Sequence, residues 1–372
     1  MKSKLSSPQP GVALLSVLLI LVLLATLAAY TAEEEDLAIR RLSNFQQAEQ
    51  SFQVAIGGEQ WGVKVLEKDI VDDQLKGPEA FDHPTETWGN LGAAVEVEGT
   101  GTTMLVSIVD AQGKMNINNL IQGRPLPERV GDQGQLVDEE GIPLENQTRE
   151  VFWYQVFRNL LISVGSLPEL ADVVVDWLDI NNQESGLSGA EDLYYMGLET
   201  PYRTANRQLV SLGELKFLRG FDAQQIARIS PYITALPVDI QDKAYTLINV
   251  NSAPEVLLAS LTIGEPLSPE TFTEVVKERA GTPFVNLEDY RNLLDARVPG
   301  GAPPGTDNLL SVSSNYFINR SCAETGRVKF SQQSLLKKIP VDQIVKVIHR
   351  ERFYGCPDLA LPDKPESQSG KQ

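Results

Sequence analysis

Oxygen-bearing side chains gather in one short, loop-like stretch of the sequence. They surround a Gly/Ser segment and are Asp179, Asn181, Gln183, Glu184, Glu191 and Asp192. Calcium takes six to eight oxygen ligands of these kinds. The first three occupy alternate positions, as in an EF-hand loop, but Gly is absent from the sixth position and Glu191 comes one residue late. The stretch predicts a calcium site that is not an EF-hand, with a solvated acidic loop as the alternative.

The two cysteines, Cys322 and Cys356, form the next pair with recognisable chemistry. In an oxidising compartment such a pair forms a disulfide more often than a reactive site. The two residues would lie at like ends of the first and third strands of a predicted three-stranded meander. This arrangement brings the Cα atoms within the range of about 4 to 7 Å that a disulfide needs. We predict a disulfide, and two free buried thiols are the alternative.

Catalysis and nucleic-acid binding find little support in the residues. The chain has two histidines, His83 and His349, no serine near a His–Asp arrangement, and no Gly loop that would cradle a phosphate. Residues 248–261 and 274–294 resemble a helix-hairpin-helix pair, but the turn between them is acidic and the net charge of −18 repels phosphate backbones. We expect a protein that is not an enzyme and does not bind nucleic acid.

An apolar stretch that must organise the remaining elements runs from Gly11 to Ala32 without a charged residue. About 20 apolar residues in a helix span the roughly 30 Å hydrocarbon core of a bilayer. Lys2 and Lys4 precede the stretch, and the acidic residues 33–36 follow it. Positive flanks stay on the cytoplasmic side. We therefore predict one membrane-spanning helix, with the body of the protein exported.

The start of this stretch has the form of a type IV pilin-like signal. In such a signal the prepilin peptidase cuts after a polar leader that ends in Gly, and the apolar run is kept. Gly11 ends the leader here, and Val12 would become the first mature residue and Ser16 the fifth. A secretory signal peptide is the alternative, but its apolar core has about 7 to 15 residues and is shorter than this run.

Patterning divides the rest of the chain into a helix, strands, a helical block and further strands. Apolar spacing continues the first helix beyond residue 33, and alternation predicts strands at 94–97, 104–109, 313–322, 327–335 and 341–352. Helical spacing dominates residues 149–296. Three capping boxes predict helix starts there, Ser166/Glu169, Ser211/Glu214 and Ser252/Glu255. This order predicts an α+β domain with an insertion between its strands.

Several motifs give the chain a resemblance to a known family. They are Gly11-Val-Ala-Leu-Leu, Asp110-Ala-Gln-Gly113 with Asn116, Asn118, Asn119 and Leu120, Asp176-Trp-Leu-Asp179, Gly189-Ala-Glu-Asp192 with Tyr194-Tyr195, Pro201-Tyr202-Arg203, Leu209-Val-Ser-Leu212 with Glu214-Leu215, and Ile248-Asn-Val-Asn-Ser-Ala-Pro254. From Gly11 to about Arg352 the chain resembles the minor pseudopilin K family (GspK) of the type II secretion system. The resemblance implies a long N-terminal transmembrane and amphipathic helix packed on a pilin-like antiparallel sheet. It also implies a large α-helical domain inserted between the strands, with calcium bound in it.

The same resemblance implies boundaries along the chain. They are a cleaved cytoplasmic leader at 1–11, a transmembrane helix at 12–32, the first part of the pilin-like domain at 33–122, an inserted helical domain of helix-hairpin-helix or SAM-like type at 123–312, the C-terminal pilin-like strands at 313–356 and a disordered tail at 357–372. The helix would cross the bacterial inner membrane once, with the N-terminus cytoplasmic and the C-terminal domain periplasmic.

The function that the resemblance implies is that of a minor pseudopilin at the tip of the pseudopilus. It would initiate pseudopilus assembly and support export of folded proteins across the outer membrane. Its partners would be the I, J and H minor pseudopilins, the major pseudopilin and the prepilin peptidase. The alternatives are a membrane-anchored periplasmic calcium-dependent binding protein outside any pseudopilus, and an exported DNA-binding protein of competence type.

Ser16 marks a departure from ordinary pilins. These generally carry Glu at the fifth mature position, where its carboxylate can neutralise the N-terminal amine of a neighbouring subunit inside the membrane, where a lone charge is expensive. A subunit with nothing above it has no such amine to neutralise. Ser16 therefore agrees with a place at the tip, and the alternative is a helix that merely has Ser here.

Overall fold

The computed structural model describes residues 10–122, 129–130, 136–137, 149–239, 245–262, 264–303 and 305–356 of the 372-residue chain. Residues 1–9 of the predicted leader and the predicted disordered tail from residue 357 lie outside the described residues.

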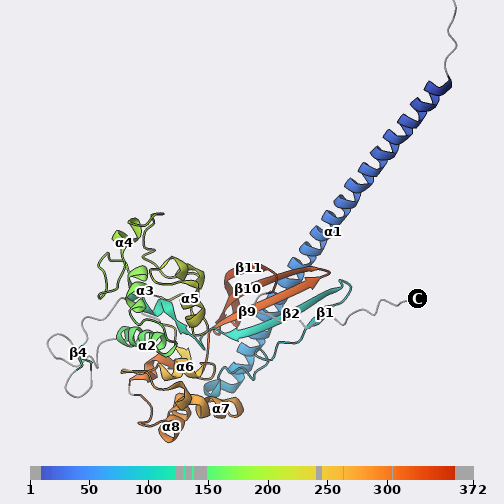
Figure 1. The fold of residues 1–372 in the computed structure, drawn as a ribbon. Coiled ribbons are helices and arrows are strands. Elements are labelled where there is room, and N and C mark those ends of the chain that lie inside the picture. Colours follow the sequence, from blue (N-terminus) through green and yellow to red (C-terminus); the bar gives the residue numbers. More distant parts are fainter. Residues whose placement is uncertain are drawn as a thin grey trace, which may run out of the picture.

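One helix, α1 (Pro10–Lys76), runs unbroken from the apolar stretch into the body of the protein (Figure 1). Its C-terminal half packs on the sheet. Gly58 and Gly62 make the close approach possible, because a Cβ on Gly58 would lie 2.8 Å from Cβ of Ser321 and one on Gly62 only 2.2 Å from Oδ1 of Asn319. Glycine weakens a helix interior by about 1 kcal/mol. Here the helix keeps two glycines because the sheet leaves no room for a side chain.

A five-stranded antiparallel sheet covers one side of α1. Its strands are β1 (Val95–Val97), β2 (Thr102–Asp110), β9 (Tyr316–Thr325), β10 (Val328–Ile339) and β11 (Ile344–Tyr354), in the order β1-β2-β9-β10-β11. Leu66 and Ile70 of α1 pack against Phe317 and Leu336 in the core between helix and sheet. Trp88 closes this core, its ring edge-on to Phe317 with 5.1 Å between centroids.

The chain between β2 and β9 forms a separate, mainly helical domain, which we call the insertion. Its helices are α2 (Arg149–Ser163), α3 (Leu170–Leu178), α4 (Asp192–Met196), α5 (Ala223–Ile229), α6 (Glu255–Ala259), α7 (Thr273–Gly281) and α8 (Leu287–Arg297). Short 3-10 turns are η2 (Ile117–Gln122), η4 (Leu212–Phe217), η5 (Pro269–Phe272) and η6 (Thr306–Leu309), and η1 (Gly77–Glu79) directly follows α1. Two-residue strands are β3 (Met115–Asn116), β4 (Arg129–Val130), β5 (Leu136–Val137), β6 (Ile233–Thr234), β7 (Ile248–Asn249) and β8 (Leu310–Ser311).

The insertion has its own hydrophobic core. Its buried apolar side chains run from Met115 to Leu310 and include Trp153, Phe157 and Tyr195. Three buried asparagines, Asn116, Asn118 and Asn119, bond the backbone of distant loops; Asn118, for example, accepts from the amide of Leu209 at 2.8 Å. Amide side chains suit this task because each both donates and accepts.

The predicted α+β architecture, with a long apolar N-terminal helix and an antiparallel sheet, is confirmed. The three C-terminal strands were predicted at 313–322, 327–335 and 341–352, and β9 to β11 each begin and end slightly later along the chain. The start of β9 is displaced because Ser314 and Asn315 bond outside the sheet, to Asp82 and Gln112.

Candidate functional site

Helix α3 places two acidic residues on one face, in an apolar setting. All nine of its residues are buried, since the Leu-Ala-Asp-Val-Val-Val-Asp-Trp-Leu sequence lies wholly inside the insertion. Asp176 stands in its last turn, and Asp179 follows as the C-cap residue, three positions later. Residues three apart on a helix lie on the same side. The fold therefore carries two carboxyl groups into the interior at the end of α3.

A third carboxyl group, from Glu191 just before α4, joins these two. Glu191 is 2% exposed. Four buried oxygen atoms of these residues lack a hydrogen-bond partner of normal geometry among the described residues, namely Oδ2 of Asp176, Oδ1 of Asp179, and Oε1 and Oε2 of Glu191. A buried polar group without a partner is costly, and a buried charge is more so. We call Asp176, Asp179 and Glu191 the carboxylate cluster.

The three groups of the carboxylate cluster influence one another electrostatically. Burial, together with the charges of Asp176 and Asp179, raises the pKa of Glu191 to about 7. Burial, with Asp176 as the second cause, raises the pKa of Asp179 to about 6. Burial also raises the pKa of Asp176, whose Oδ1 accepts from the amide of Ser185 at 2.9 Å. None of the causes of these three shifts is a positive charge from a described residue.

The backbone at Gly189 lies tightly against the carboxylate cluster. A Cβ there would stand 2.3 Å from Oδ2 of Asp176, so a larger residue would displace that carboxylate. The nearby guanidinium of Arg219 stacks on the ring of Tyr194, 4.8 Å from its centroid, and donates to the carbonyl oxygen of Gly189 at 3.4 Å.

The other predicted calcium ligands lie outside the carboxylate cluster. Asp192 accepts from the amide and hydroxyl of Thr204 at 3.0 and 2.9 Å, and pairs with Arg203 at 3.2 Å. Oδ1 of Asn181 accepts from the amide of Gln183 at 2.7 Å, and the side chains of Asn181, Gln183 and Glu184 are exposed. Of the six predicted residues, the structure places Asp179 and Glu191 in the carboxylate cluster. Asp176 joins them, and its position three residues before Asp179 was the available signal for it.

The carboxylate cluster fits a calcium ion on the chemistry of its donors. Calcium prefers carboxylate oxygens, and the four unpartnered oxygens are all of this kind. Carbonyl groups and water would have to complete its shell of six to eight ligands. These observations make the cluster the site where the predicted calcium ion would be held.

A second cluster of acidic residues differs from the carboxylate cluster because it surrounds a lysine. Asp69, Asp73 and Asp82 bring carboxylate oxygens within 4.8 Å of one another. The buried ammonium group of Lys338 bonds Asp69 and Asp82 and lies 3.5 Å from Asp73. A positive charge therefore already occupies the centre of this group, which we call the lysine cluster. Sequence reasoning missed it, because its members lie far apart along the chain.

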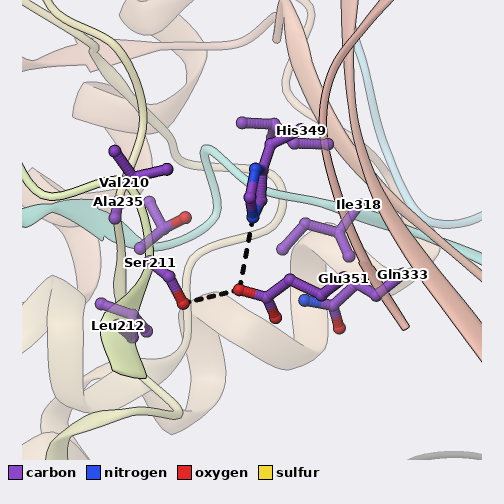
Figure 2. A pocket seen from close by; sticks show the side chains of 10 residues that line it. Val210, Ser211, Leu212, Ala235, Ile318, Gln333, His349 and Glu351 are labelled. Carbon is purple, nitrogen blue, oxygen red and sulfur yellow. Dashed lines mark hydrogen bonds and ion pairs between the residues drawn. The ribbon is translucent and has the colours of Figure 1, made fainter. Parts of the chain in front are cut away.

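A cavity of about 120 Å³ lies between residues 210–212 of the insertion and strands β9 to β11 (Figure 2). Ser211 donates its hydroxyl to Oε1 of Glu351 at 2.6 Å, and Nε2 of His349 lies 3.5 Å from the same oxygen. In a Ser–His–Asp arrangement the histidine bonds the serine hydroxyl directly. Ser211 instead bonds the carboxylate of Glu351, and it caps η4 by accepting from Gly213 at 3.2 Å. The cavity therefore does not have the geometry of a Ser–His–Asp arrangement.

The predicted disulfide is confirmed, and it links strand β9 to the residues that follow strand β11. Cys322 of β9 is bonded to Cys356, which follows β11, with 5.8 Å between their Cα atoms.

The N-terminal part of α1 carries the apolar stretch. It is the one helix in the described residues that is long and apolar enough to cross a membrane, with a mean hydropathy of 2.5 over 18 residues, none of them buried. The predicted boundary of Gly11 and Val12 lies at its start, and Ser16 follows within the exposed stretch. The chain thus has a single long apolar N-terminal helix, consistent with a single-pass membrane anchor.

Comparison with known proteins identifies the family. Residues 113–238 match the family model described as type II secretion system (T2SS), protein K. Type II secretion system protein K of Pectobacterium carotovorum subsp. carotovorum is 30% identical over 360 residues, which cover 94% of this chain and 97% of the relative. The protein of the same description from Aeromonas hydrophila is 29% identical over 329 residues, covering 88% of this chain and 92% of the relative.

A solved structure shares the fold. It is a chain of the GspK-GspI-GspJ complex from the enterotoxigenic Escherichia coli type 2 secretion system, with a TM-score of 0.64 at 19% identity, and the match covers 84% of this chain and 99% of that chain. The relatives match over nearly their whole length, including the insertion and the sheet. The chain therefore belongs to the type II secretion system protein K family and is a minor pseudopilin of that system.

Proposed function

We propose that this minor pseudopilin occupies the tip of the pseudopilus and starts its assembly. The observation that carries the proposal is the place of the insertion, at the end of α1 opposite to the apolar segment and to one side of the sheet (Figure 1). In a filament of parallel helices, the next subunit on the periplasmic side would have to enter the space that the insertion fills. A subunit of this shape can have neighbours below it and none above.

Ser16 supports the same place in the filament. The amine of Val12, once freed by cleavage, would still attract the fifth-position Glu of the subunit below. The side chain of Ser16 offers no carboxylate to the amine of a subunit above, and an unpaired charge within the membrane is costly. Such a subunit begins a filament and does not extend along it.

The partners follow from the proposed position. The relative with the same fold was solved in a complex with GspI and GspJ. We assign the corresponding I and J subunits as direct partners of this chain, with the H subunit and the major pseudopilin below them. The protein then acts as a structural part of the machine that exports folded proteins, with no catalytic step of its own.

Filaments labelled on this chain test the proposed position. Pseudopili sheared from cells that carry an epitope on the full chain should bind gold-labelled antibody at one end only. Label along the length of the filament would contradict the tip position. Filaments without any label would favour a membrane-anchored binding protein that is not part of the pseudopilus. Copurification of the I and J subunits with the tagged chain checks the partners independently.

The same proposal includes leader cleavage and a defined orientation. We expect the prepilin peptidase to cut between Gly11 and Val12, with Lys2 and Lys4 on the cytoplasmic side and the insertion in the periplasm. N-terminal sequencing of the mature chain should begin at Val12, and Gly11→Val should leave the leader attached. A mature start beyond Ala29 would identify an ordinary signal peptide instead.

Calcium binding at the carboxylate cluster is the second part of the proposal. Asp176, Asp179 and Glu191 would hold the ion, whose two positive charges would offset two of the three buried carboxylate charges. A ligand that binds only the folded state stabilises it by about 2.7 kcal/mol at a hundredfold excess over its Kd. The ion would therefore stabilise the insertion, the part of the chain furthest along the proposed filament.

Thermal unfolding of the full chain in detergent tests calcium binding. The midpoint in excess calcium should lie above the midpoint in chelator, and magnesium should raise it less because it needs a smaller, near-octahedral shell. Equal midpoints with calcium and with chelator would remove calcium from the proposal and leave the tip position untouched.

A further inference from the structure

Two short segments connect the insertion to the sheet, and they run side by side. The first leaves β2 at Asp110, and the second returns to β9 at Tyr316. Because β2 and β9 are neighbours in the sheet, the segments enter and leave at one place. The amide of Ala111 donates to the carbonyl oxygen of Tyr316 at 3.0 Å. The angle between insertion and sheet is therefore decided by the contacts around this pair of segments.

Asp110 and Asn249 meet at the centre of this connection, and both are buried. Nδ2 of Asn249, from β7 of the insertion, donates to Oδ2 of Asp110 at 2.8 Å. The hydroxyl of Ser314, on the returning segment, donates to the same oxygen at 2.8 Å. One carboxylate thus binds the insertion and the returning segment at once.

Gln112 makes a second bridge of the same kind. Its Nε2 donates to the carbonyl oxygen of Leu247 at 3.0 Å, and its Oε1 accepts from the amides of Asn315 and Tyr316 at 2.6 and 3.1 Å. Its own carbonyl oxygen accepts from the amide of Asn249 at 2.8 Å. The outgoing segment, the insertion and the returning segment are therefore bonded to one another through a single side chain.

The contacts continue without a break to α1. Nδ2 of Asn249 donates to the carbonyl oxygen of Asp82 at 2.9 Å, and the amide of Ser314 donates to Oδ2 of Asp82 at 2.6 Å. The other carboxylate oxygen of Asp82 bonds Lys338, which also bonds Asp69 of α1. We call these residues, Asp69, Asp82, Asp110, Gln112, Asn249, Ser314 and Lys338, the junction network. It joins the insertion to α1 through buried side chains.

Burial makes the junction network resistant to rotation of the insertion. If the insertion turned, Asp110 and Asn249 would separate inside the protein, and each unsatisfied buried group would be left without the water that normally replaces a partner. The opposite side of the connection is different. There the open cavity of Figure 2 separates the insertion from the sheet, and Ser211 and Glu351 supply the hydrogen bond that crosses it.

We propose that the junction network is a positioning element, which fixes the insertion at one angle to α1 so that both move as one rigid body. The motifs Asp110-Ala-Gln-Gly113 and Ile248-Asn-Val-Asn-Ser-Ala-Pro254 supply its centre, and Gly113 is required because a Cβ there would stand 2.7 Å from Cβ of Ser252. Its importance for a filament rests on the proposed function, since contacts made by the insertion at the tip would then set the angle of the membrane helix.

Spin labels on the two parts of the full chain test this proposal. Lys64 of α1 and Lys277 of α7 are exposed, and each is replaced by cysteine, while Cys322 and Cys356 stay in their disulfide. Pulsed electron spin resonance in detergent should give one narrow distance for the wild-type network. Asp110→Asn should widen the distribution at least twofold, because an amide has one acceptor oxygen and cannot accept both from Gln112 and from Asn249 with Ser314, as the two carboxylate oxygens do.

Matched variants separate positioning from general damage. Ser211→Ala removes the contact across the open cavity and should leave the distribution narrow. Buried Trp153 and Trp177 report the fold of the insertion through their fluorescence. If Asp110→Asn fails to fold, Ser314→Ala takes its place, because it removes one hydroxyl and keeps the backbone bond to Asp82; it should widen the distribution.

Two results would overturn the proposal. One is a broad distance distribution in the wild-type protein. The other is a narrow distribution in the folded network variants, Asp110→Asn or, where this does not fold, Ser314→Ala. The measurement uses the chain without partners, so it is independent of where the protein lies in a filament. A failure of the tip position in the labelling experiment would leave the distances unchanged.

Discussion

The lysine cluster and the carboxylate cluster bury the same chemical groups and differ in one charge. Asp69, Asp73 and Asp82 surround Lys338, which lies between helix α1 and strand β10. In the carboxylate cluster of the insertion, no cationic side chain of the described residues bonds Asp176, Asp179 or Glu191. The lysine cluster has its counter-charge from the chain itself. Under the proposal, the carboxylate cluster would take its counter-charge from a calcium ion in solution.

The largest loss of stability should come from removing the positive charge of the lysine cluster. Lys338→Met leaves buried carboxylates without their cation, and breaking such a pair costs about 3 to 5 kcal/mol. Chemical unfolding of the full chain in detergent measures the loss. Lys346→Met, at an exposed position of β11, is the control and should change stability by less than about 0.5 kcal/mol. Similar losses for both variants would mean that the cluster is not stabilised by its lysine.

Glu191→Gln should reduce the need for an outside cation in the carboxylate cluster. The variant replaces one of three repelling charges, so the metal-free protein should be more stable than the wild type. The calcium increment, about 2.7 kcal/mol at a hundredfold excess over Kd in the wild type, should largely disappear. Unfolding with calcium and with chelator measures both effects. A variant that keeps the full increment would exclude Glu191 as a ligand.

Acidification should stabilise the metal-free insertion, as Glu191→Gln should. Burial raises the pKa of Asp179 to about 6 and that of Glu191 to about 7, above their ordinary values. The folded state then holds protons that the unfolded chain releases. Metal-free stability should therefore rise as the pH falls from about 8 to about 5.

The lysine cluster also contributes to that pH dependence, because burial raises the pKa of Asp69 to about 6 and that of Asp82 to about 7. Comparison of the wild type with Glu191→Gln separates the contributions of the two clusters. The gain on acidification should be smaller in Glu191→Gln than in the wild type by about 1 kcal/mol. Equal gains in the two proteins would place the titration elsewhere. The calcium increment itself should shrink at low pH, since protons compete for the same oxygens.

The smallest effect is expected at the exposed part of the predicted ligand set. Glu184→Gln should leave the calcium increment within about 0.5 kcal/mol of the wild-type value, because the side chain points into solvent. Calorimetric titration of the two proteins in parallel measures the difference. A marked loss of affinity in this variant would mean that the loop closes over the ion and that the sequence-based set describes the bound state better.

Local signals in the sequence predicted the elements and only part of the contacts. Alternation gave strands β9 to β11, and apolar spacing gave α1 as far as Gly57 and Gly58, where the pattern weakens although the helix continues to Lys76. Of three predicted capping boxes, Ser211 with Glu214 forms one. Ser166 instead donates to Gln225, and α6 has Pro254 at its N-cap position without a side-chain cap. Ser211 keeps its cap although its hydroxyl also donates to Glu351, so a tertiary contact by itself does not prevent a capping motif from forming.

The candidate site, too, was predicted only in part from the sequence. Asp179 and Glu191 were predicted because they stand in one oxygen-rich stretch, while Asp176 was missed as a ligand because it lies inside an apolar helix. Lys338 lies 269 residues from Asp69 and 256 from Asp82. No spacing rule joins residues so far apart, and their meeting depends on how β10 packs on α1. The predicted ligands in the exposed loop stay predictions until an ion is measured.

The adjacency of β2 and β9 gives the molecule a modular character. Asp110 pairs with Phe317 across two antiparallel neighbours, so a turn of a few residues would connect the two strands directly. In topological terms, the whole insertion is one enlarged hairpin loop. Chain closure costs only about 0.6 kcal/mol for each doubling of loop length. The sheet can therefore accept a folded domain at this turn with little entropic loss. A pilin-like sheet can gain an inserted domain in this way without a change in its own strand order.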